Sequence, residues 1–152
     1  MSAAAGPRPQ AHARRWARRL AMQALYQWDL AVADPAEIEH QFREREDFTG
    51  VDDEYFRELL HRVPARVVEV DAALAPGLER PLGGIDPVER ALLRVAGYEL
   101  LYRPDVPYRV VINEAVELAK KFGAEQAYTF VNGVLDRVAR DLRAAEWNRD
   151  HV

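Results

Sequence analysis

Cysteine is absent from this chain of 152 residues, and serine occurs only once, as Ser2. Without cysteine there are no disulfides, no thiolate metal ligands and no thiol nucleophile. With serine confined to the second position, a Ser-His-Asp triad is not available. The lack of cysteine agrees with a reducing compartment, and we expect a cytoplasmic protein.

Long apolar runs are missing as well. No stretch reaches the roughly 18 apolar residues that a membrane-spanning helix needs. The segment 1–13 also lacks the continuous apolar core of a secretory signal. We therefore expect no association with a membrane.

Motifs for catalysis or metal binding are scarce. No two of the four histidines are spaced i and i+4, and no HExxH motif occurs; they are His12, His40, His61 and His151. No glycine-rich loop leads into a Lys-Ser or Lys-Thr pair, so the common phosphate-cradling loop is absent. The carboxylates lie mostly at expected helix starts or in helical i, i+4 pairs. We therefore expect no metal, no cofactor and no enzymatic activity.

Positive charge is concentrated near the N-terminus, although the whole chain carries −4. Through Trp28 the only charged side chains are five arginines, so the remainder of the chain carries −9. These are Arg8, Arg14, Arg15, Arg18 and Arg19. Because salt screens charge beyond about 8–10 Å, a phosphate backbone responds to this local patch more than to the net charge. A basic arm on an acidic body favours a nucleic-acid partner.

Apolar residues recur at helical spacing through most of the chain, without the alternation typical of strands. We therefore predict an all-α fold of about six to seven helices. The expected helices span about 13–32, 34–47, 52–74 (kinked or split at Pro64), 86–103, 107–123 and 124–143. We interpret residues 1–12 as a disordered tail, 13–145 as one helical domain with a subdomain break near 76–84, and 146–152 as a frayed C-terminus.

One face of the first predicted helix combines cations with polar and aromatic side chains. At 100° per residue, the side opposite the apolar arc carries Arg15, Arg19, Met22, Gln23 and Tyr26, flanked by Arg14 and Arg18. Guanidinium groups pair with phosphates and stack on bases, and a tyrosine can stack an unpaired base. The pattern favours single-stranded RNA as the ligand. The alternative is a solvated polar face, because arginine is also a good helix former.

The last predicted helix offers a second candidate. Phe130 lies at the edge of its apolar arc, and the neighbours on the outer side are Gln126, Gly133 and Arg137. An edge aromatic beside an amide and a cation could stack a base. A phenylalanine at the margin of the core is an equally good interpretation.

Several longer motifs resemble the NusB family of transcription antitermination factors. Residues 106–123 read VPYRVVINEAVELAKKFG, and residues 130–136 read FVNGVLD. Shorter matches are ALYQ at 24–27, YF at 55–56, VERALLR at 88–94 and YEL at 98–100. The resemblance extends over about residues 13–143, and the VINEA and FVNGVL stretches are its most specific parts.

The resemblance implies a fold of two packed helical bundles and binding to the boxA element of ribosomal RNA transcripts. It also implies a heterodimer with the ribosomal protein NusE. This pair joins NusA, NusG and RNA polymerase to suppress premature termination.

Individual residues take their roles from the same resemblance. The family's arginine-rich RNA-binding segment matches Arg14, Arg15 and Arg18, and its aromatic positions near RNA match Tyr26 and Phe130. An acidic position facing NusE matches Glu89, and Glu99 is expected on the same surface. Together with Arg19, Gln23 and Gln126, these residues form the predicted site.

Two positions depart from the family's pattern, and one matching residue has a second role. Trp16 interrupts the arginine run where another basic residue is frequent, and Gln126 replaces an acid that is common near the RNA surface. Both changes bear on RNA affinity and sequence preference. Glu89 is also the third residue of its predicted helix, where a glutamate can cap the helix start.

Two other functions are compatible with a small helical chain. A similar domain precedes the catalytic domain of certain ribosomal RNA cytosine methyltransferases, but here the chain ends at Val152 without a glycine-rich loop after a strand. The other is a protein-interaction module without an RNA role, with a homodimer as one form. The Arg15–Arg19–Tyr26 face argues against that module.

Overall fold

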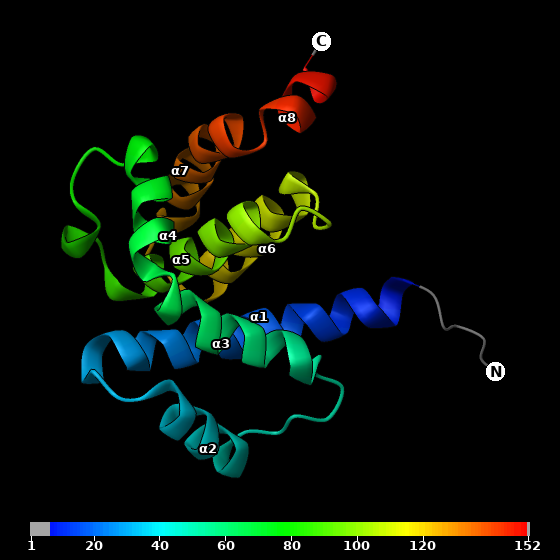
Figure 1. The fold of residues 1–152 in the computed structure, drawn as a ribbon, viewed down its shortest axis with the longest axis vertical. Coiled ribbons are helices and arrows are strands. Elements are labelled where there is room, and N and C mark those ends of the chain that lie inside the picture. Colours follow the sequence, from blue (N-terminus) through cyan, green and yellow to red (C-terminus); the bar gives the residue numbers. More distant parts are fainter. Residues whose placement is uncertain (1–6, 152) are drawn as a thin grey trace. The chain divides into compact units, whose positions relative to one another are not determined.

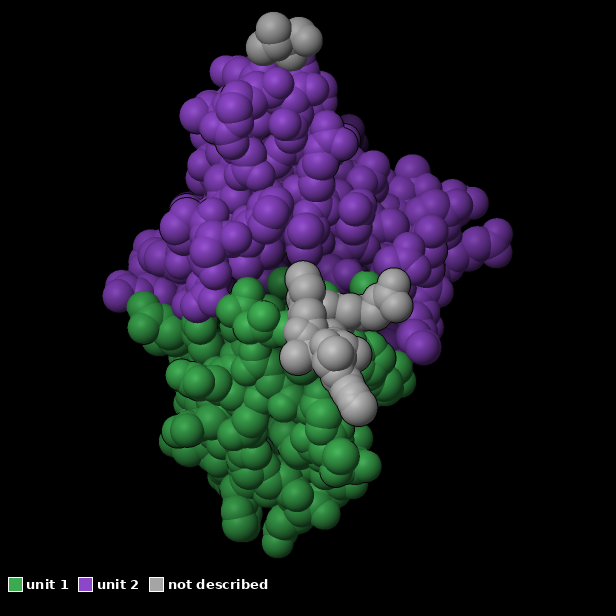
Figure 2. All heavy atoms as spheres, turned by 90° about the vertical axis from the view of Figure 1, so that its right-hand side faces the viewer, with its two compact units in different colours: residues 1–65 green, residues 66–152 purple. Residues whose placement is uncertain are grey.

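The computed structural model describes residues 7–151, which form eight α-helices and two short 3-10 helices and contain no β-strand (Figure 1). The predicted all-α class is confirmed. The predicted number of six to seven helices is too low for this part of the chain, because the segment after Arg143 forms a further helix. None of the helices in residues 7–151 is both long and apolar enough to cross a membrane. Two compact units, Met1–Ala65 and Arg66–Val152, are described separately (Figure 2).

Unit 1 contains α1 (Pro7–Ala31), α2 (Pro35–Arg45) and α3 (Asp53–Ala65). The first helix begins at Pro7 and not near Ala13, since proline is well tolerated in the first turn of a helix. Residues 7–12 of the predicted tail are therefore helical, and residues 1–6 lie outside the described part of the chain. The start of α2 agrees with its prediction, because Asp34 accepts a hydrogen bond from the Ala36 amide at 2.8 Å.

The core of unit 1 forms where α2 and α3 meet each other and α1. The buried side chains on α2 and α3 are Ile38, Phe42, Tyr55, Phe56, Leu59, Leu60 and Val63. The rings of Phe42 and Phe56 stack with centroids 6.4 Å apart. These contacts hold α2 at a fixed position beside the other two helices of the unit.

A cluster of charges also ties α2 to α3. The Glu39 carboxylate lies 2.6 Å from Nε2 of His61 and 2.8 Å from the guanidinium of Arg43, which in turn reaches Asp53 at 2.6 Å. Burial by itself raises the pKa of Glu39, but hydrogen bonds from His61 and Arg43 outweigh it and lower the pKa overall. The cluster therefore favours the ionised carboxylate and links the two helices.

Unit 2 is built around a central helix. It contains α4 (Val67–Leu74), the 3-10 turns η1 (Ala75–Gly77) and η2 (Leu82–Gly84), α5 (Pro87–Tyr102), α6 (Tyr108–Phe122), α7 (Ala127–Leu142) and α8 (Ala144–Asp150). The helix α5 contacts α4, α6 and α7, and its buried residues lie on most of its sides. This agrees with the all-round apolar character of residues 88–101.

The predicted subdomain break at residues 76–84 falls inside unit 2. The boundary between the units lies instead at Ala65, directly after Pro64 in the last turn of α3. The segment 76–84 belongs to unit 2 because η1, which contains Gly77, packs closely against α7. A Cβ at position 77 would lie 2.7 Å from the Val134 carbonyl oxygen, so only glycine allows η1 to approach α7 so closely.

A buried guanidinium holds the far end of unit 2 together. Arg143 donates hydrogen bonds of 2.9–3.1 Å to four backbone carbonyls, and its side chain also pairs with Glu146 at 2.8 Å. The carbonyls belong to Glu99, Leu100, Arg103 and Val106. Arg143 therefore supplies additional donors to carbonyl oxygens at the C-terminal end of α5 and in the turn that follows it, where a helix has fewer backbone donors of its own.

The C-terminal segment was expected to fray from residue 146, but α8 continues to Asp150, and its side chains complete the same arrangement. Val152 lies outside the described residues. Glu146 accepts a hydrogen bond from the Tyr108 amide at 2.9 Å, at the start of α6. The Trp147 ring packs beside Tyr108 with centroids 5.2 Å apart. These are contacts over about forty residues of sequence, which local patterns do not reveal.

We predict that Arg143→Lys lowers the free energy of unfolding by about 3 kcal/mol. An ammonium cannot reach the same five oxygens, and hydrogen bonds to a charged group contribute about 1.5–3 kcal/mol each. Urea unfolding monitored by circular dichroism measures the change. The control is Arg149→Lys, at an exposed position of α8, and it should leave stability unchanged. Equal stability of the two variants would contradict the role given to Arg143.

Candidate functional site

The four arginines between positions 14 and 19 of α1 separate into an inward and an outward pair. The guanidinium of Arg14 lies 4.4 Å from the centre of the Tyr55 ring, and that of Arg18 lies 5.5 Å from it. Arg18 is only 4% exposed. Arg15 is exposed, and Arg19 is partly exposed with its guanidinium 4.7 Å from the Trp16 ring.

The inward pair attaches α1 to α3. Arg14 also pairs with Asp52 at 3.6 Å, and the Asp52 amide donates to the Ala13 carbonyl at 3.1 Å. Tyr55 and Asp52 were not among the predicted site residues, because their role depends on how α3 packs against α1. Arg14 and Arg18 thus lie against Tyr55 of α3 within unit 1.

Trp16 is part of the outward surface. It is 37% exposed, and its indole nitrogen donates to His12 at 3.0 Å. An exposed aromatic ring under a guanidinium gives two flat groups on which a base can stack. Trp16 therefore adds a stacking surface beside Arg19.

Farther along α1 the predicted face is only partly correct. Met22 is 2% exposed and belongs to the core, because the apolar arc of α1 is wider than the sequence suggested. Gln23 is partly exposed and Tyr26 is 37% exposed. The exposed face thus runs from Arg15 and Arg19 to Gln23 and Tyr26.

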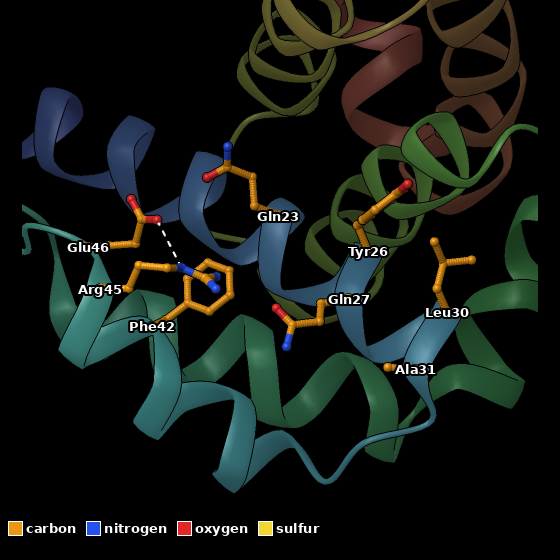
Figure 3. Close-up of a pocket in the computed structure, with 8 residues that line it drawn as sticks. All are labelled: Gln23, Tyr26, Gln27, Leu30, Ala31, Phe42, Arg45 and Glu46. Atoms are coloured by element: carbon orange, nitrogen blue, oxygen red, sulfur yellow. Dashed lines mark ion pairs between the residues drawn. The ribbon is translucent and has the colours of Figure 1, made fainter.

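A pocket opens beside this face, between α1 and α2 (Figure 3). Its volume is about 480 Å³, within the range of about 300–1,000 Å³ usual for small-molecule sites. It is lined by Gln23, Tyr26, Gln27, Leu30, Ala31, Phe42, Arg45 and Glu46. Only Gln23 and Tyr26 belonged to the predicted site. The α2 residues were missed because their position beside α1 is a tertiary feature.

In unit 2, Gln126 and Phe130 lie at the start of α7. Gln126 is exposed in the left-handed conformation, with φ of 72°, and it immediately precedes the helix. Phe130 is half-buried in a hollow of about 630 Å³ that Arg80, Thr129 and Gly133 also line. Arg137, expected beside Phe130, pairs along α7 with Asp141 at 2.7 Å.

Gly133 adds no side chain to the lining of this hollow. It is in the middle of α7, and a Cβ built there would meet no atom within 4 Å. Glycine inside a helix costs about 0.5–1 kcal/mol relative to alanine. Packing within the described residues does not require it, so the open helix face is available to a molecule that binds beside Phe130.

The two predicted partner residues have different surroundings. Glu89 is half-buried in the first turn of α5, where Asp86 caps the helix by accepting from the Val88 amide at 2.9 Å. Burial raises the pKa of Glu89, and the nearby Asp86 raises it further. Glu99 is 1% exposed, so its carboxylate is inside unit 2 and not on the expected surface. α5 is covered on most sides, and its neighbours enclose this carboxylate as well as the apolar side chains.

The histidines do not converge on a metal. Among residues 7–151 there is no group of three or more His, Cys, Asp or Glu side chains that could hold a metal ion. His61 lies against Glu39, and His151 stacks on Trp147 with centroids 4.1 Å apart. The predicted RNA-binding residues that lie at the surface belong to the face of α1, with its pocket, and to the hollow around Phe130.

Comparison with known proteins gives consistent matches. A model of the NusB family matches residues 15–140. The chain is 56% identical over 142 residues to the transcription antitermination protein NusB of Pseudomonas entomophila, covering 93% of this chain and 86% of the relative. It is 55% identical over 134 residues to NusB of Alcanivorax borkumensis, covering 88% and 89%. The solved structure of T. maritima NusB matches with a TM-score of 0.74 and 31% identity, covering 89% of this chain and 96% of that chain.

We predict that Gly133→Ala raises the free energy of unfolding by about 0.5–1 kcal/mol, since alanine favours the helix and its methyl group meets open space. The matched control is Gly97→Ala in α5, where the new Cβ would lie 3.1 Å from a Leu74 methyl carbon. That variant should lose stability. Chemical denaturation of both variants measures the difference. A loss of stability in Gly133→Ala would show that other atoms of the protein already occupy the space next to Gly133.

We predict that Glu89→Gln stabilises the protein at pH 7 and leaves it unchanged near pH 3. A raised pKa means that the fold disfavours the ionised carboxylate, so this penalty develops as pH rises through the pKa of Glu89 and is absent below the ordinary value of about 4.3. Thermal unfolding at the two pH values tests the sign. An equal loss of stability at both values would instead indicate that Glu89 caps α5.

Proposed function

Because this chain belongs to the NusB family of transcription antitermination proteins, we propose that it binds boxA-type RNA of ribosomal RNA transcripts. It does so as an adaptor, together with the ribosomal protein NusE. The resulting complex joins NusA, NusG and RNA polymerase and helps the polymerase to resist termination. No step of this role requires a cofactor or a metal.

The observation that carries the RNA part of the proposal is the outward face of α1. Arg15 and Arg19 stand one helical turn apart beside the exposed Trp16 ring. Cations that pair with phosphates and rings that stack bases are the two elements of single-strand binding. In the proposal, Arg15 of the family's arginine segment and the neighbouring Arg19 contact the RNA. Arg14 and Arg18, held against Tyr55, position them.

Unit 2 contributes a second contact in the proposal. Phe130 offers a ring edge in an open hollow, with Arg80 in the same lining and Gln126 exposed at the start of α7. A base that stacks on Phe130 has room because Gly133 carries no side chain. The proposed RNA residues of this unit are therefore Gln126 and Phe130.

Glu89 is the proposed contact for NusE. The hydrogen-bonded cap of α5 is made by Asp86, so Glu89 is not needed to begin the helix. A half-buried carboxylate with a raised pKa gains from a cationic partner, which compensates for its desolvation. Glu99, being buried, supports this surface from inside and does not contact a partner directly.

The experiment is salt-dependent binding of a short boxA-type RNA, with and without NusE. We predict that changing Arg15 and Arg19 together to alanine reduces the slope of log affinity against log salt by up to about 1.4, since each phosphate contact on a single strand contributes about 0.7. The matched control changes the exposed Arg62 and Arg149 to alanine, with the same loss of charge. Its slope should stay close to that of the unchanged protein.

Two results would count against the proposal. An unchanged slope in the Arg15 and Arg19 variant would show that the RNA face lies elsewhere on the protein. Absence of RNA binding even in the presence of NusE would remove the adaptor role itself.

A further inference from the structure

The pocket between α1 and α2 differs in chemistry from the arginine face that leads to it. Its only charged groups are Arg45 and Glu46, which pair with each other at 3.4 Å. The remaining lining consists of two neutral amides and of apolar or aromatic side chains. A lining without net charge does not select a phosphate and instead suits a neutral and largely apolar group.

The polar groups of the pocket suit the edge of a flat heterocycle. Gln27 donates from its amide nitrogen to the Gln41 side-chain oxygen at 2.9 Å, which fixes the direction of its own amide group. Figure 3 shows Gln27 directed from α1 toward α2, with Gln23 one turn earlier on the same helix. Each glutamine amide carries both a donor and an acceptor, which is the combination that pairs with the edge of a nucleobase.

Flat groups also line the pocket. The guanidinium of Arg45 lies 4.7 Å from the centre of the Phe42 ring, and Phe42 is only 2% exposed, so it forms a buried apolar floor. Tyr26 is 37% exposed and Leu30 is 52% exposed along the α1 side. Guanidinium and phenol planes both stack on bases. Apolar side chains left exposed beside them gain from being covered.

The pocket is continuous with the proposed RNA face. Arg19, Gln23 and Gln27 follow each other at intervals of one turn on α1, so the pocket begins within about 12 Å of the last outward arginine. Its α2 wall is held in place by the Glu39 cluster and by the stacking of Phe42 on Phe56. A strand paired to Arg15 and Arg19 can therefore deliver its next base to a preformed pocket.

We propose that this pocket takes one unstacked nucleobase of the bound single-stranded RNA, with Gln27 at its edge and Arg45 and Tyr26 as stacking surfaces. The proposal rests on the RNA-binding function proposed above. It adds Gln27, Phe42 and Arg45 to the binding residues and makes α2 part of the interface.

The first test identifies the bound base by removing the bases of the RNA one at a time. A boxA-type RNA is prepared as a series in which one nucleotide at a time is abasic, and each member is titrated against the full chain. The RNA that is abasic at the position bound in the pocket should bind about 5- to 100-fold more weakly than the intact RNA, as expected for removal of a stacked base. Ala31→Phe places a ring in the pocket. This variant should bind the intact RNA more weakly, and removal of the base at that position should no longer lower its affinity.

The matched control for the ring is Ala36→Phe, at an exposed position of α2 outside the pocket lining. It should bind the RNA series as the unchanged protein does. Gln27→Ala is a second variant for the case in which Ala31→Phe fails to fold, and it should reduce the loss at the same abasic position. Circular dichroism establishes that each variant is folded.

A second test separates contact from charge. Arg45→Gln and Arg62→Gln remove the same charge from unit 1, but only Arg45 lines the pocket. If the base stacks on Arg45, Arg45→Gln weakens binding several-fold more than Arg62→Gln and reduces the loss at the same abasic position. Equal small losses in the two variants, with that loss unchanged, would mean that Arg45 acts only through its charge, and this overturns its place in the pocket.

The outcomes distinguish the two proposals. If the unchanged protein binds no RNA, the function proposed above fails. If it binds RNA with a slope that depends on Arg15 and Arg19, while no abasic position responds to Ala31→Phe or to Gln27→Ala, the pocket proposal is overturned and the function stands. A concentration-dependent dimer lost in Ala31→Phe without any change in RNA binding would assign the pocket to a second copy of the chain, and this also overturns it.

Discussion

Unit 2 depends on one buried cation, the guanidinium of Arg143. It supplies donors to carbonyl oxygens at the end of α5 and in the following turn, and it pairs with Glu146 of α8. The last oxygens of a helix carry partial negative charge, so a cation there is favoured both by hydrogen bonding and by the helix dipole. The central helix that carries Glu89 and packs against the helix of Phe130 is thereby fixed at its far end.

The arginines at positions 14–19 of α1 have two different environments, and this difference determines the surface of the helix. Four arginines within six positions read as one basic patch, yet two of them lie at the Tyr55 ring and two lie along the outward face. The exposed face of α1 is therefore better described by the order of its side chains than by its total charge. Two cations with an aromatic ring between them come first, and two amides with a tyrosine between them follow beside a neutral pocket.

Local signals predicted much of this architecture. The Asp-Pro pairs at 34–35 and 86–87 marked two helix starts, and both aspartates cap their helices as expected. Helical periodicity also placed Arg15, Arg19, Gln23 and Tyr26 on one face. Burial of Arg18 and Glu99, the helix after Arg143 and the α2 side of the pocket were not predictable in this way. Each is decided by a contact with another element, which no local pattern encodes.

The stacked geometry at Tyr55 has a consequence for sequence variation. Lysine provides a point charge, whereas arginine provides a plane that packs on an aromatic face. At the outward positions, 15 and 19, exchange between the two residues keeps the charge in place. At positions 14 and 18 the same exchange removes the plane that rests near Tyr55. Substitutions that look equally conservative along one helix are therefore unequal, and the tolerance of each arginine to lysine reveals whether it supports the fold or serves the surface.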